Sequence, residues 1–296
     1  MQFGKAKTDD AKAPDPALEH LATRLGALET AIADVARTLS NIHANQSVAL
    51  IDSLANTPRF ADARRITCAY GQVFSQNNED GIIAEIFRRI GTKTRHFVEI
   101  AAGDGIENTT RLLLETGWKG LWVEAGSAEL DSIRHSVGPA LANGDLTLVD
   151  SMITLDNLSE KVLSRIDFEP DYVSVDIDYN TGHIWRRLAD LRPRLFCIEY
   201  NAHYPPAMDH EVPYKADGVW AGTTRFGASL KALETIGRDM GYSLVGCDIF
   251  GVNAFFVRDD LCEKDLFLAP FTAENHYEPP RFSAVRMRGH GRHPAL

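Results

Sequence analysis

A strand-to-turn segment in the first half of the chain carries residue types that suit ligand binding. Residues 96–101 (HFVEIA) are apolar and strand-forming, and Gly103 and Gly105 follow them. Glycines at the turn between a strand and a helix let the backbone approach a ligand closely. The next expected strand ends at Glu124, where a carboxylate can accept hydrogen bonds from a ribose diol. The pattern predicts a nucleoside cofactor, and a tight turn without a ligand is the alternative.

Three details favour S-adenosylmethionine over a nicotinamide dinucleotide as that cofactor. Asn108 stands where the dinucleotide fingerprint needs its third glycine. Glu99 lies within the motif, where a carboxylate can bind the cationic amino group of a methionine moiety. Two expected strands near the end of the chain, 242–249 and 253–261, form a closing hairpin that is typical of a methyltransferase sheet.

A second group of polar side chains follows two later strands. Asp176 and Asp178 end the expected strand 171–178, and Glu199 and Asn201 end the strand 195–201. Ligands gather at the carboxyl ends of neighbouring parallel strands, so we expect these side chains to converge. Oxygen ligands of this kind suit Mg²⁺ or Mn²⁺, or else Ca²⁺. The alternative is that they hydrogen-bond the amino group of the cofactor and the acceptor directly, without a metal.

Transfer of a methyl group to a hydroxyl needs a base or a metal that removes the proton. His183 and His203 follow the two acidic segments, and their near-neutral reference pKa suits this role. We therefore predict His183, His203 and Asp178 as catalytic residues, although a loop histidine is more often simply solvated. Tyr204 and Trp220 are candidates for packing against the acceptor, or for plain core packing.

Strands and helices alternate through the middle of the chain, which predicts an α/β fold with a parallel sheet. The expected strands are 96–101, 120–125, 145–153, 171–178, 195–201 and the closing pair, and the expected helices are 82–90, 108–116, 158–166, 184–191 and 227–241. We expect one such domain over residues 58–278. Residues 279–296, with four arginines and no acid after Pro279, are expected to form a basic flexible tail.

The N-terminal part of the chain has a different pattern. Residues 1–16 are polar and contain two prolines, which predicts a disordered leader. Apolar residues then alternate spacings of three and four, which is a heptad pattern: Leu18, Leu21, Leu25, Leu28, Ile32, Val35, Leu39 and Ile42. This narrow stripe predicts a coiled-coil helix over 17–57 and a homo-oligomer, or a docked partner enzyme, through residues 18–42. An amphipathic helix packed on its own domain is the alternative.

Composition and charge limit the classes of function. The 296 residues carry a formal net charge of −10, which argues against nucleic acid as the main partner. No apolar stretch is long enough for a transmembrane helix, and the N-terminus lacks the apolar core of a signal peptide. The four cysteines are scattered without a CxxC pair, which predicts reduced thiols in a cytoplasmic protein.

Several segments together resemble the FkbM-type family of S-adenosylmethionine-dependent methyltransferases. They span roughly residues 70 to 262 and include SQNNEDGIIAEIF, FVEIAAGDGIENTTRLLLETGWKGLWVEA, DIDYNTGHIWRRL and RPRLFCIEYNAHYPP. The resemblance implies a class I (Rossmann-like) fold, O-methylation and a sugar or polyketide-type acceptor. It also implies cofactor-binding roles for Ser75, Gln76 and Asp80 at the methionine end, for Glu99, Gly103, Gly105 and Glu124, and for Asp150 and Ser151 beside the adenine.

The sequence departs from the family pattern at two places. Ala101 stands where the pattern has its first glycine, and Tyr179, Thr181 and Gly182 alter the segment after the two aspartates. We predict an S-adenosylmethionine-dependent O-methyltransferase for a saccharide or glycoconjugate hydroxyl, with Ala101, Asn108 and Asp176 among the cofactor contacts. The alternative function, which these departures favour, is a non-catalytic oligomeric scaffold with a degenerate methyltransferase fold.

Overall fold

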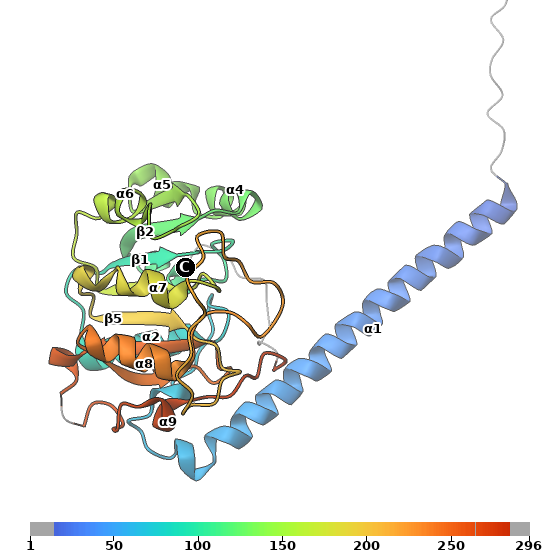
Figure 1. The fold of residues 1–296 in the computed structure, drawn as a ribbon. Helices are drawn as coiled ribbons and strands as arrows, with labels where there is room; N and C mark the ends of the chain where they lie inside the picture. The colour runs from blue at the N-terminus through green and yellow to red at the C-terminus, as the bar shows by residue number, and fades with distance from the viewer. Residues whose placement is uncertain (1–14, 264, 285–296) are drawn as a thin grey trace, which may run out of the picture.

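The computed structural model describes residues 15–263 and 265–284. Within them, seven strands form one sheet in the order β3-β2-β1-β4-β5-β7-β6 (Figure 1). The first five strands are parallel, and β7 runs antiparallel to both of its neighbours. The strands are β1 (His96–Ile100), β2 (Lys119–Glu124), β3 (Leu146–Asp150), β4 (Tyr172–Val175), β5 (Leu195–Glu199), β6 (Tyr242–Cys247) and β7 (Asn253–Arg258). This is the sheet of class I methyltransferases, so the predicted fold class is confirmed.

Helices cover both faces of the sheet, which explains why the central strands are continuous apolar runs. One face packs against α2 (Glu79–Ile90), α3 (Arg111–Glu115), α4 (Ser127–Ser136) and α5 (Gly138–Asn143). The other packs against α6 (Leu158–Lys161), α7 (Thr181–Arg186), α8 (Leu230–Asp239) and α9 (Ala273–His276). Short 3₁₀ turns lie at Pro58–Phe60, Ile66–Cys68, Leu163–Arg165, Ala189–Leu191 and Asp259–Leu261.

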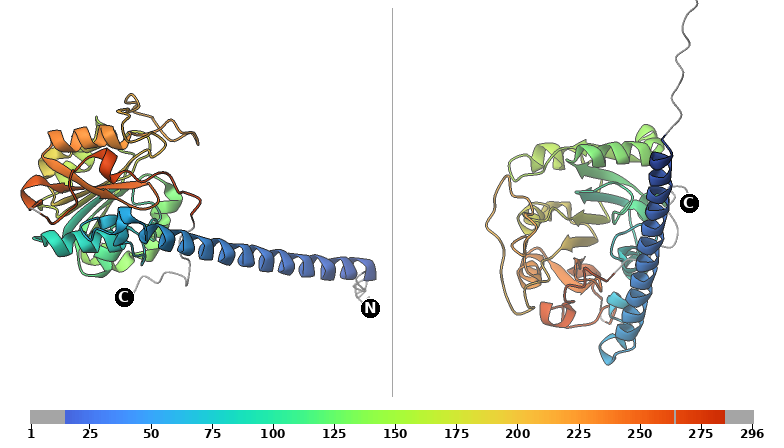
Figure 2. Two further views of the ribbon diagram at one scale, coloured as in Figure 1. Left: turned by 90° about the horizontal axis from the view of Figure 1, so that it is seen from below. Right: turned by 90° about the vertical axis from the view of Figure 1, so that its right-hand side faces the viewer.

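Helix α1 (Pro16–Ala55) is 40 residues long and projects away from the domain (Figures 1 and 2). The carboxylate of Asp15 caps its first turn by accepting from the backbone N of Ala17 at 2.9 Å. The predicted long helix is therefore confirmed, but it begins at Pro16, inside the range predicted as a leader; residues 1–14 lie outside the described part of the chain. The alternative of an amphipathic helix packed on its own domain is wrong, because its apolar stripe is exposed.

Several element boundaries differ from the prediction. The helix predicted over 108–116 is only α3, because the residues before it are held in an irregular loop. The region between β2 and β3 contains α4 and α5, for which we predicted no helix. In α4 only Leu130 and Ile133 are buried, so its apolar periodicity is weak. Strand β4 ends at Val175, so Asp176 and Asp178 lie in the following loop.

Residues after Pro279 are in part packed against the domain. The backbone N of Arg281 donates to the carbonyl of Phe250 at 2.8 Å, and its guanidinium donates to Glu278 at 2.9 Å. The described start of the predicted tail is therefore anchored on the turn between β6 and β7, and residues 285–296 lie outside the described part. Among the described residues, no helix combines the length and apolar character needed to cross a membrane.

Candidate functional site

The strand order reverses between β1 and β4, and the candidate site lies at this point. In an open α/β sheet, such a reversal opens a crevice at the carboxyl ends of the strands. The residues that follow β1 form the glycine-containing turn, and Asp176 follows β4. The parallel pairing of β1 with β4 therefore brings together two segments that the sequence analysis singled out separately.

The turn after β1 has three residues in the left-handed region. They are Ala101, Gly103 and Gly105, with φ values of 65°, 60° and 71°. The backbone N atoms of Ala101 and Ala102 both donate to the carbonyl of Val123, at 2.9 and 3.1 Å, which ties the turn to β2. A left-handed conformation costs an L-residue roughly 1–2 kcal/mol, so Ala101 is strained where the family pattern has glycine.

We expect Ala101→Gly to raise the free energy of unfolding by about 0.5–1 kcal/mol, because relief of the left-handed strain exceeds the entropic cost of glycine. Urea unfolding of the two proteins measures this difference. The control is Ala102→Gly, because Ala102 is buried beside Ala101 and has no positive φ. The control should lower stability by about 1 kcal/mol, and stabilisation by both substitutions would contradict the strain.

Glu99 is buried, and both of its carboxylate oxygens already have partners. Oε1 accepts from the backbone N and hydroxyl of Thr109 at 2.9 and 2.7 Å. Oε2 accepts from Asn108 Nδ2 at 2.5 Å and from the backbone N and hydroxyl of Thr110 at 3.2 and 2.5 Å. Burial raises the pKa of Glu99, and these donors oppose the rise. Glu99 therefore orders the loop before α3, and it also lines the cavity of about 310 Å³ described next, so its direct contact with a cofactor amine stays a prediction.

Asn108 offers a second acceptor beside Glu99. Its Oδ1 is buried and has no hydrogen-bond partner among the described residues. The residue lines a cavity of about 310 Å³, together with Gly103, Gln76, Asn77 and others. A buried amide oxygen without a partner costs free energy, which a donor on a bound ligand would recover.

A second cavity of about 90 Å³ lies on the other side of the turn. It is lined by Glu124, Ser151 and apolar side chains that include Ile153 and Ile177. Ala101 lines both cavities, so the two meet at the turn. The site thus consists of the cavity of about 310 Å³, which has a polar lining, and the cavity of about 90 Å³, which is more apolar; the left-handed turn lies between them.

Glu124 lies where the sequence analysis placed it, at the end of β2. Its Oε2 accepts from the backbone N of Gly103 at 2.8 Å. Its Oε1 accepts from the backbone N atoms of Ala125 and Gly126 at 2.7 and 2.9 Å. One carboxylate therefore connects the two turns that border the smaller cavity.

Three other predicted cofactor contacts point elsewhere. Asp150 is exposed, with its Oδ2 3.6 Å from Arg134, and does not line either cavity. Ser75 and Asp80 are buried and hold the loop before α2: the Ser75 hydroxyl accepts from the Asp80 backbone N at 3.0 Å. Asp80 Oδ2 accepts from three successive backbone N atoms at 2.7–2.9 Å, those of Val73, Phe74 and Ser75. This loop presents Gln76 and Asn77 to the larger cavity.

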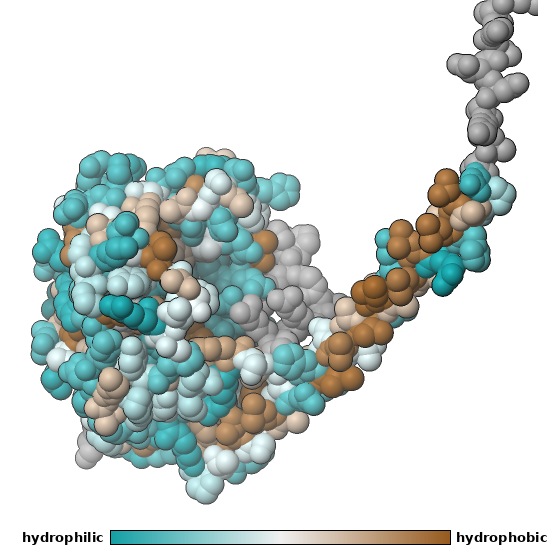
Figure 3. Space-filling view, turned by 45° about the vertical axis from the view of Figure 1, so that its right-hand side comes forward, coloured by the Kyte–Doolittle hydropathy of each residue, from teal (hydrophilic) through white to brown (hydrophobic). Residues whose placement is uncertain are grey.

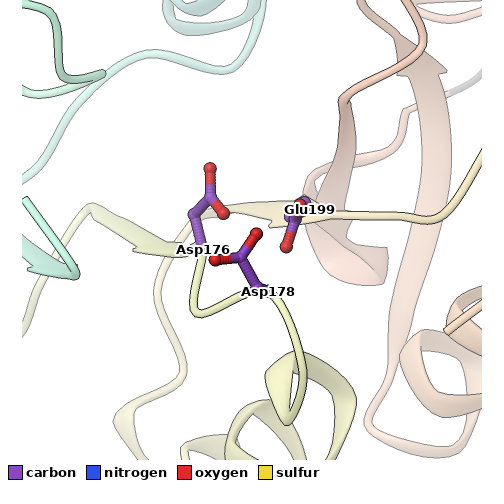
Figure 4. A group of neighbouring side chains, drawn as sticks. All are labelled: Asp176, Asp178 and Glu199. Atoms are coloured by element: carbon purple, nitrogen blue, oxygen red, sulfur yellow. The ribbon is translucent and has the colours of Figure 1, made fainter. Parts of the chain in front are cut away.

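Asp176, Asp178 and Glu199 converge at the ends of β4 and β5 (Figure 4). One oxygen from each carboxylate lies within 4.8 Å of the others. Burial, and then the charge of Asp178, raise the pKa of Asp176 to about 7. Burial and the two aspartates raise the pKa of Glu199 well above its usual value. We call these residues the acidic triad.

The acidic triad should make stability depend on pH. The folded pKa of Asp176, about 7, exceeds its usual value of 3.8, so its contribution to stability is complete below pH 3.8 and lost as the pH rises to about 7. In EDTA, we expect Asp176→Asn to stabilise the protein by roughly 1–2 kcal/mol more at pH 8 than at pH 5, after allowance for partial solvent access. Urea unfolding at both pH values measures this. The exposed Asp156→Asn is the control, and an equal effect at both pH values would contradict the prediction.

Asn201 and His183 do not have the predicted surroundings. Asn201 is buried; its Nδ2 donates to the carbonyls of Thr224 and Phe226 at 2.8 and 2.9 Å, and its Oδ1 accepts from the backbone N of His203 at 3.1 Å. It therefore orders the 201–226 loop and is corrected as a metal ligand. His183 Nε2 donates to the carbonyl of Val212 at 2.8 Å, and the residue lines none of the cavities described here, so its predicted role as a base is also corrected.

A third cavity, of about 540 Å³, adjoins the acidic triad. Asp178, Glu199 and His203 line one part of it, and Gln76 and Asn77 line both this cavity and the larger cofactor-side cavity. Its aromatic lining residues are Trp220, Phe226, Phe250 and Phe282. Tyr204, the other predicted packing residue, contacts His210 with tilted rings whose centroids are 4.6 Å apart, and it does not line the cavity.

Several residues that line the cavities were not predicted from the sequence. Glu79 is buried and accepts from Asn77 Nδ2 at 3.1 Å and from Asn253 Nδ2 at 2.8 Å. All three line the larger cofactor-side cavity. The polar run at 76–80 was a visible signal for Asn77 and Glu79. No local signal marked Asn253, which reaches the site because β7 inserts beside β5.

Comparisons with known proteins show distant structural likeness. No protein-family model matches the sequence, and no curated protein matches it significantly. The METTL16 methyltransferase domain is 15% identical over 60% of this chain and 66% of that chain, with a TM-score of 0.39. A candidate O-methyltransferase from Klebsiella pneumoniae is 16% identical over 74% and 99%, with a TM-score of 0.43. The glycopeptide N-methyltransferase MtfA with S-adenosylmethionine is 16% identical over 62% and 95%, with a TM-score of 0.35. The fold assignment itself comes from the strand order of the sheet.

Proposed function

We propose that this chain is an S-adenosylmethionine-dependent O-methyltransferase. One observation carries the proposal: two cavities meet at the left-handed turn after β1, and a third cavity adjoins them across the acidic triad. A two-part ligand and an acceptor could therefore lie end to end at the topological switch point of the sheet. The FkbM-type lineage remains part of this proposal.

The lining residues fit each part of the cofactor. The smaller cavity, with Ile153 and Ile177, suits the flat adenine, and Ser151 is its polar neighbour. Glu124 suits the ribose diol. The unpartnered Oδ1 of Asn108, in the cofactor-side cavity of about 310 Å³, suits the ammonium of the methionine moiety. S-adenosylmethionine, when bound, supplies a methyl group on a positively charged sulfur that is open to attack by a nucleophile.

The third cavity supports a saccharide or glycoconjugate hydroxyl as acceptor. Aromatic side chains lie around it, and Trp220 and Phe282 are more than half exposed there, at 53% and 52%. Flat aromatic surfaces beside hydrogen-bonding groups suit the apolar faces and hydroxyls of a sugar ring. Asp178, Glu199 and His203 supply the polar groups.

The proton of the acceptor hydroxyl would be removed by a residue that lines the acceptor-side cavity beside the acidic triad. His203 lines the cavity, and its backbone is held by Asn201. Its ring is in edge contact with Phe282 at 5.5 Å between centroids. We assign His203 as the general base, since a histidine can take up a proton near neutral pH.

The acidic triad would hold a divalent cation in this scheme. Three carboxylates with only oxygen donors fit Mg²⁺ or Mn²⁺, and their mutual repulsion would be relieved by a positive ion. Such an ion, when bound, supplies Lewis acidity that lowers the pKa of a nearby acceptor hydroxyl. Asp176 lines the cofactor side and Asp178 the acceptor side, so the triad separates the two ligands.

The experiment that tests this function is calorimetric titration with S-adenosylhomocysteine, with and without Mg²⁺ or Mn²⁺. We expect saturable binding to the intact chain and a change of affinity when the metal is present. Asp178→Asn should abolish the metal effect and keep S-adenosylhomocysteine binding. Asp209→Asn, at an exposed acid of the 201–226 loop, is the matched control.

The outcomes separate the parts of the proposal. Absence of S-adenosylhomocysteine binding in every condition would overturn the enzyme and favour the scaffold. Binding without any metal effect would remove the cation and leave His203 as the base. A homo-oligomer through residues 18–42 and a cytoplasmic location complete the proposal, and both remain predictions.

A further inference from the structure

The apolar stripe of α1 is the largest set of exposed apolar side chains on a single helix of the described chain. Its eight members, which we call the α1 stripe, are between 49% and 63% exposed: Leu18, Leu21, Leu25, Leu28, Ile32, Val35, Leu39 and Ile42. Figure 3 shows them as a continuous apolar band along the projecting helix. A band of this size in water indicates a surface that another molecule covers.

The domain covers only the last turns of α1. Ser47 and Ile51 are its two buried residues, and Ile51 packs with Ile249 and Phe250. The heptad ends before this contact, because its next two positions are Gln46 and Ala49. The helix is therefore divided into a root fixed on the domain and an arm whose stripe has no cover in the described chain.

The stripe has the geometry of a coiled-coil seam. Taking Leu18 as position a, the a positions are Leu18, Leu25, Ile32 and Leu39, and the d positions are Leu21, Leu28, Val35 and Ile42. Strict a and d spacing over several heptads matches a partner helix with the same spacing. A second copy of this chain has that spacing by identity.

Charges beside the seam select an orientation. The flanking e positions are Ala22, Glu29, Ala36 and His43, and the g positions are Arg24, Ala31, Thr38 and Asn45. Arg24 and Glu29 are the strongly basic and the acidic side chain among them. In a parallel coiled coil, a g residue faces the e residue of the following heptad on the partner helix. Arg24 of one helix would then face Glu29 of the other, twice in each pair of helices. An antiparallel arrangement places g opposite g and e opposite e, which separates these two charges.

We propose that α1 forms a parallel, in-register coiled coil with α1 of further copies of this chain over Leu18–Ile42, with Arg24 facing Glu29 between copies. This inference deepens the homo-oligomer proposed above by giving its orientation and register, and it does not rest on the methyltransferase activity. A lipid surface is disfavoured, because the described arm carries acidic Glu19, Glu29 and Asp34 beside its two arginines, and membrane-surface helices need a basic polar face.

The orientation has a consequence for the site. The parallel coil would gather the domains at one end, joined through roots that pack on Phe250, a residue that also lines the acceptor-side cavity. The strand ends and the arm lie on the same side of the domain in Figure 1. The acceptor-side cavities of the copies would therefore open toward the same side of the assembly.

The first test is the molar mass of the intact chain by light scattering over a range of concentrations. We expect an oligomer, and we expect the Leu25→Glu/Ile32→Glu variant to be monomeric at the same concentrations, with association weakened at least ~100-fold by charges in the seam. Both positions are exposed in the single chain, so the domain should still fold and bind S-adenosylhomocysteine as before. Ala33→Glu, on the opposite face, should leave the mass unchanged. A monomeric mass for the intact chain overturns the proposal.

The second test determines orientation. Leu21→Cys should crosslink to itself under mild oxidation, because residue 21 of neighbouring copies is adjacent only in a parallel register; an antiparallel overlap of residues 18–42 would separate them by about 27 Å. Ala27→Cys, which points away from the seam, is the control. Arg24→Glu and Glu29→Arg should each weaken association about 3- to 10-fold, and the double exchange should restore it. An oligomer without the Leu21→Cys crosslink, or without restoration, overturns the parallel arrangement.

Discussion

Glu124→Ala should weaken S-adenosylhomocysteine binding about 30- to 100-fold, or roughly 2–3 kcal/mol, in a calorimetric titration at constant salt. The carboxylate accepts from the backbone of Gly103 on one turn and of Gly126 on the next. Its removal takes away the acceptor for the ribose diol and also releases the two turns that border the smaller cavity. Glu124→Gln keeps the shape and part of the hydrogen bonding, so it should lose less affinity.

Asp150→Ala is the matched control for this prediction. Asp150 ends β3 and pairs in register with Glu124 at the end of β2, so both substitutions remove an acid from the same edge of the sheet. Asp150 is exposed and lies outside the cavities, and we expect its removal to change the affinity less than about twofold. Equal losses in both variants would indicate a general charge effect and contradict a specific role for Glu124.

Gly105→Ala should lower the free energy of unfolding by about 2–4 kcal/mol, measured by urea unfolding. Gly105 has a φ of 71°, which is unfavourable for any L-residue. A Cβ at this position would lie 2.8 Å from Ile133 Cγ1 and 3.0 Å from the ring of Trp122. Trp122 of β2 is fully buried, and Ile133 packs α4 against the same core, so neither side chain has room to move away.

Gly103→Ala separates backbone strain from steric overlap. Gly103 has a similar φ of 60°, but a Cβ there would meet no atom within 4 Å. We expect this variant to lose only about 1 kcal/mol, the cost of the left-handed conformation alone. If the two variants lost equal stability, packing of the turn against α4 would not be the reason for glycine at position 105.

Local sequence pattern was sufficient for the fold class and for most of the strands and helices. The inner parallel strands β1, β2, β4 and β5 are short, largely apolar runs that are buried on both faces, and a run such as HFVEI is visible without knowledge of its neighbours. The amphipathic pattern of α2 and the heptads of α1 are also local, and both helices lie where they were predicted. The glycines after β1 and the acidic residues at the ends of other strands predicted the location of the site, because parallel strands all end at one edge of the sheet.

The direction of each polar side chain was decided by the tertiary structure. Glu99 was predicted from its place within the strand-to-turn motif, and Asn201 and His183 from their positions at or after strand ends, but each is engaged by a loop. Glu99 holds the residues before α3, Asn201 holds the 201–226 loop, and His183 holds the carbonyl of Val212. A buried polar group must be hydrogen-bonded, and its partner comes from whichever segment the fold packs beside it.

The convergence of the three acids was predicted from the order of the strands, whereas the position of Asn253 was not. Asp176, Asp178 and Glu199 form the acidic triad because β4 and β5 are neighbours in the sheet, and Asn253 reaches the cofactor-side cavity because β7 is inserted antiparallel beside β5. The sequence by itself therefore determined most of the elements, with the exception of α4 and α5, and the edge that carries the site. Only the tertiary structure decided which side chains face the cavities, because hydrogen-bond partners and strand neighbours are contacts between residues far apart in the chain.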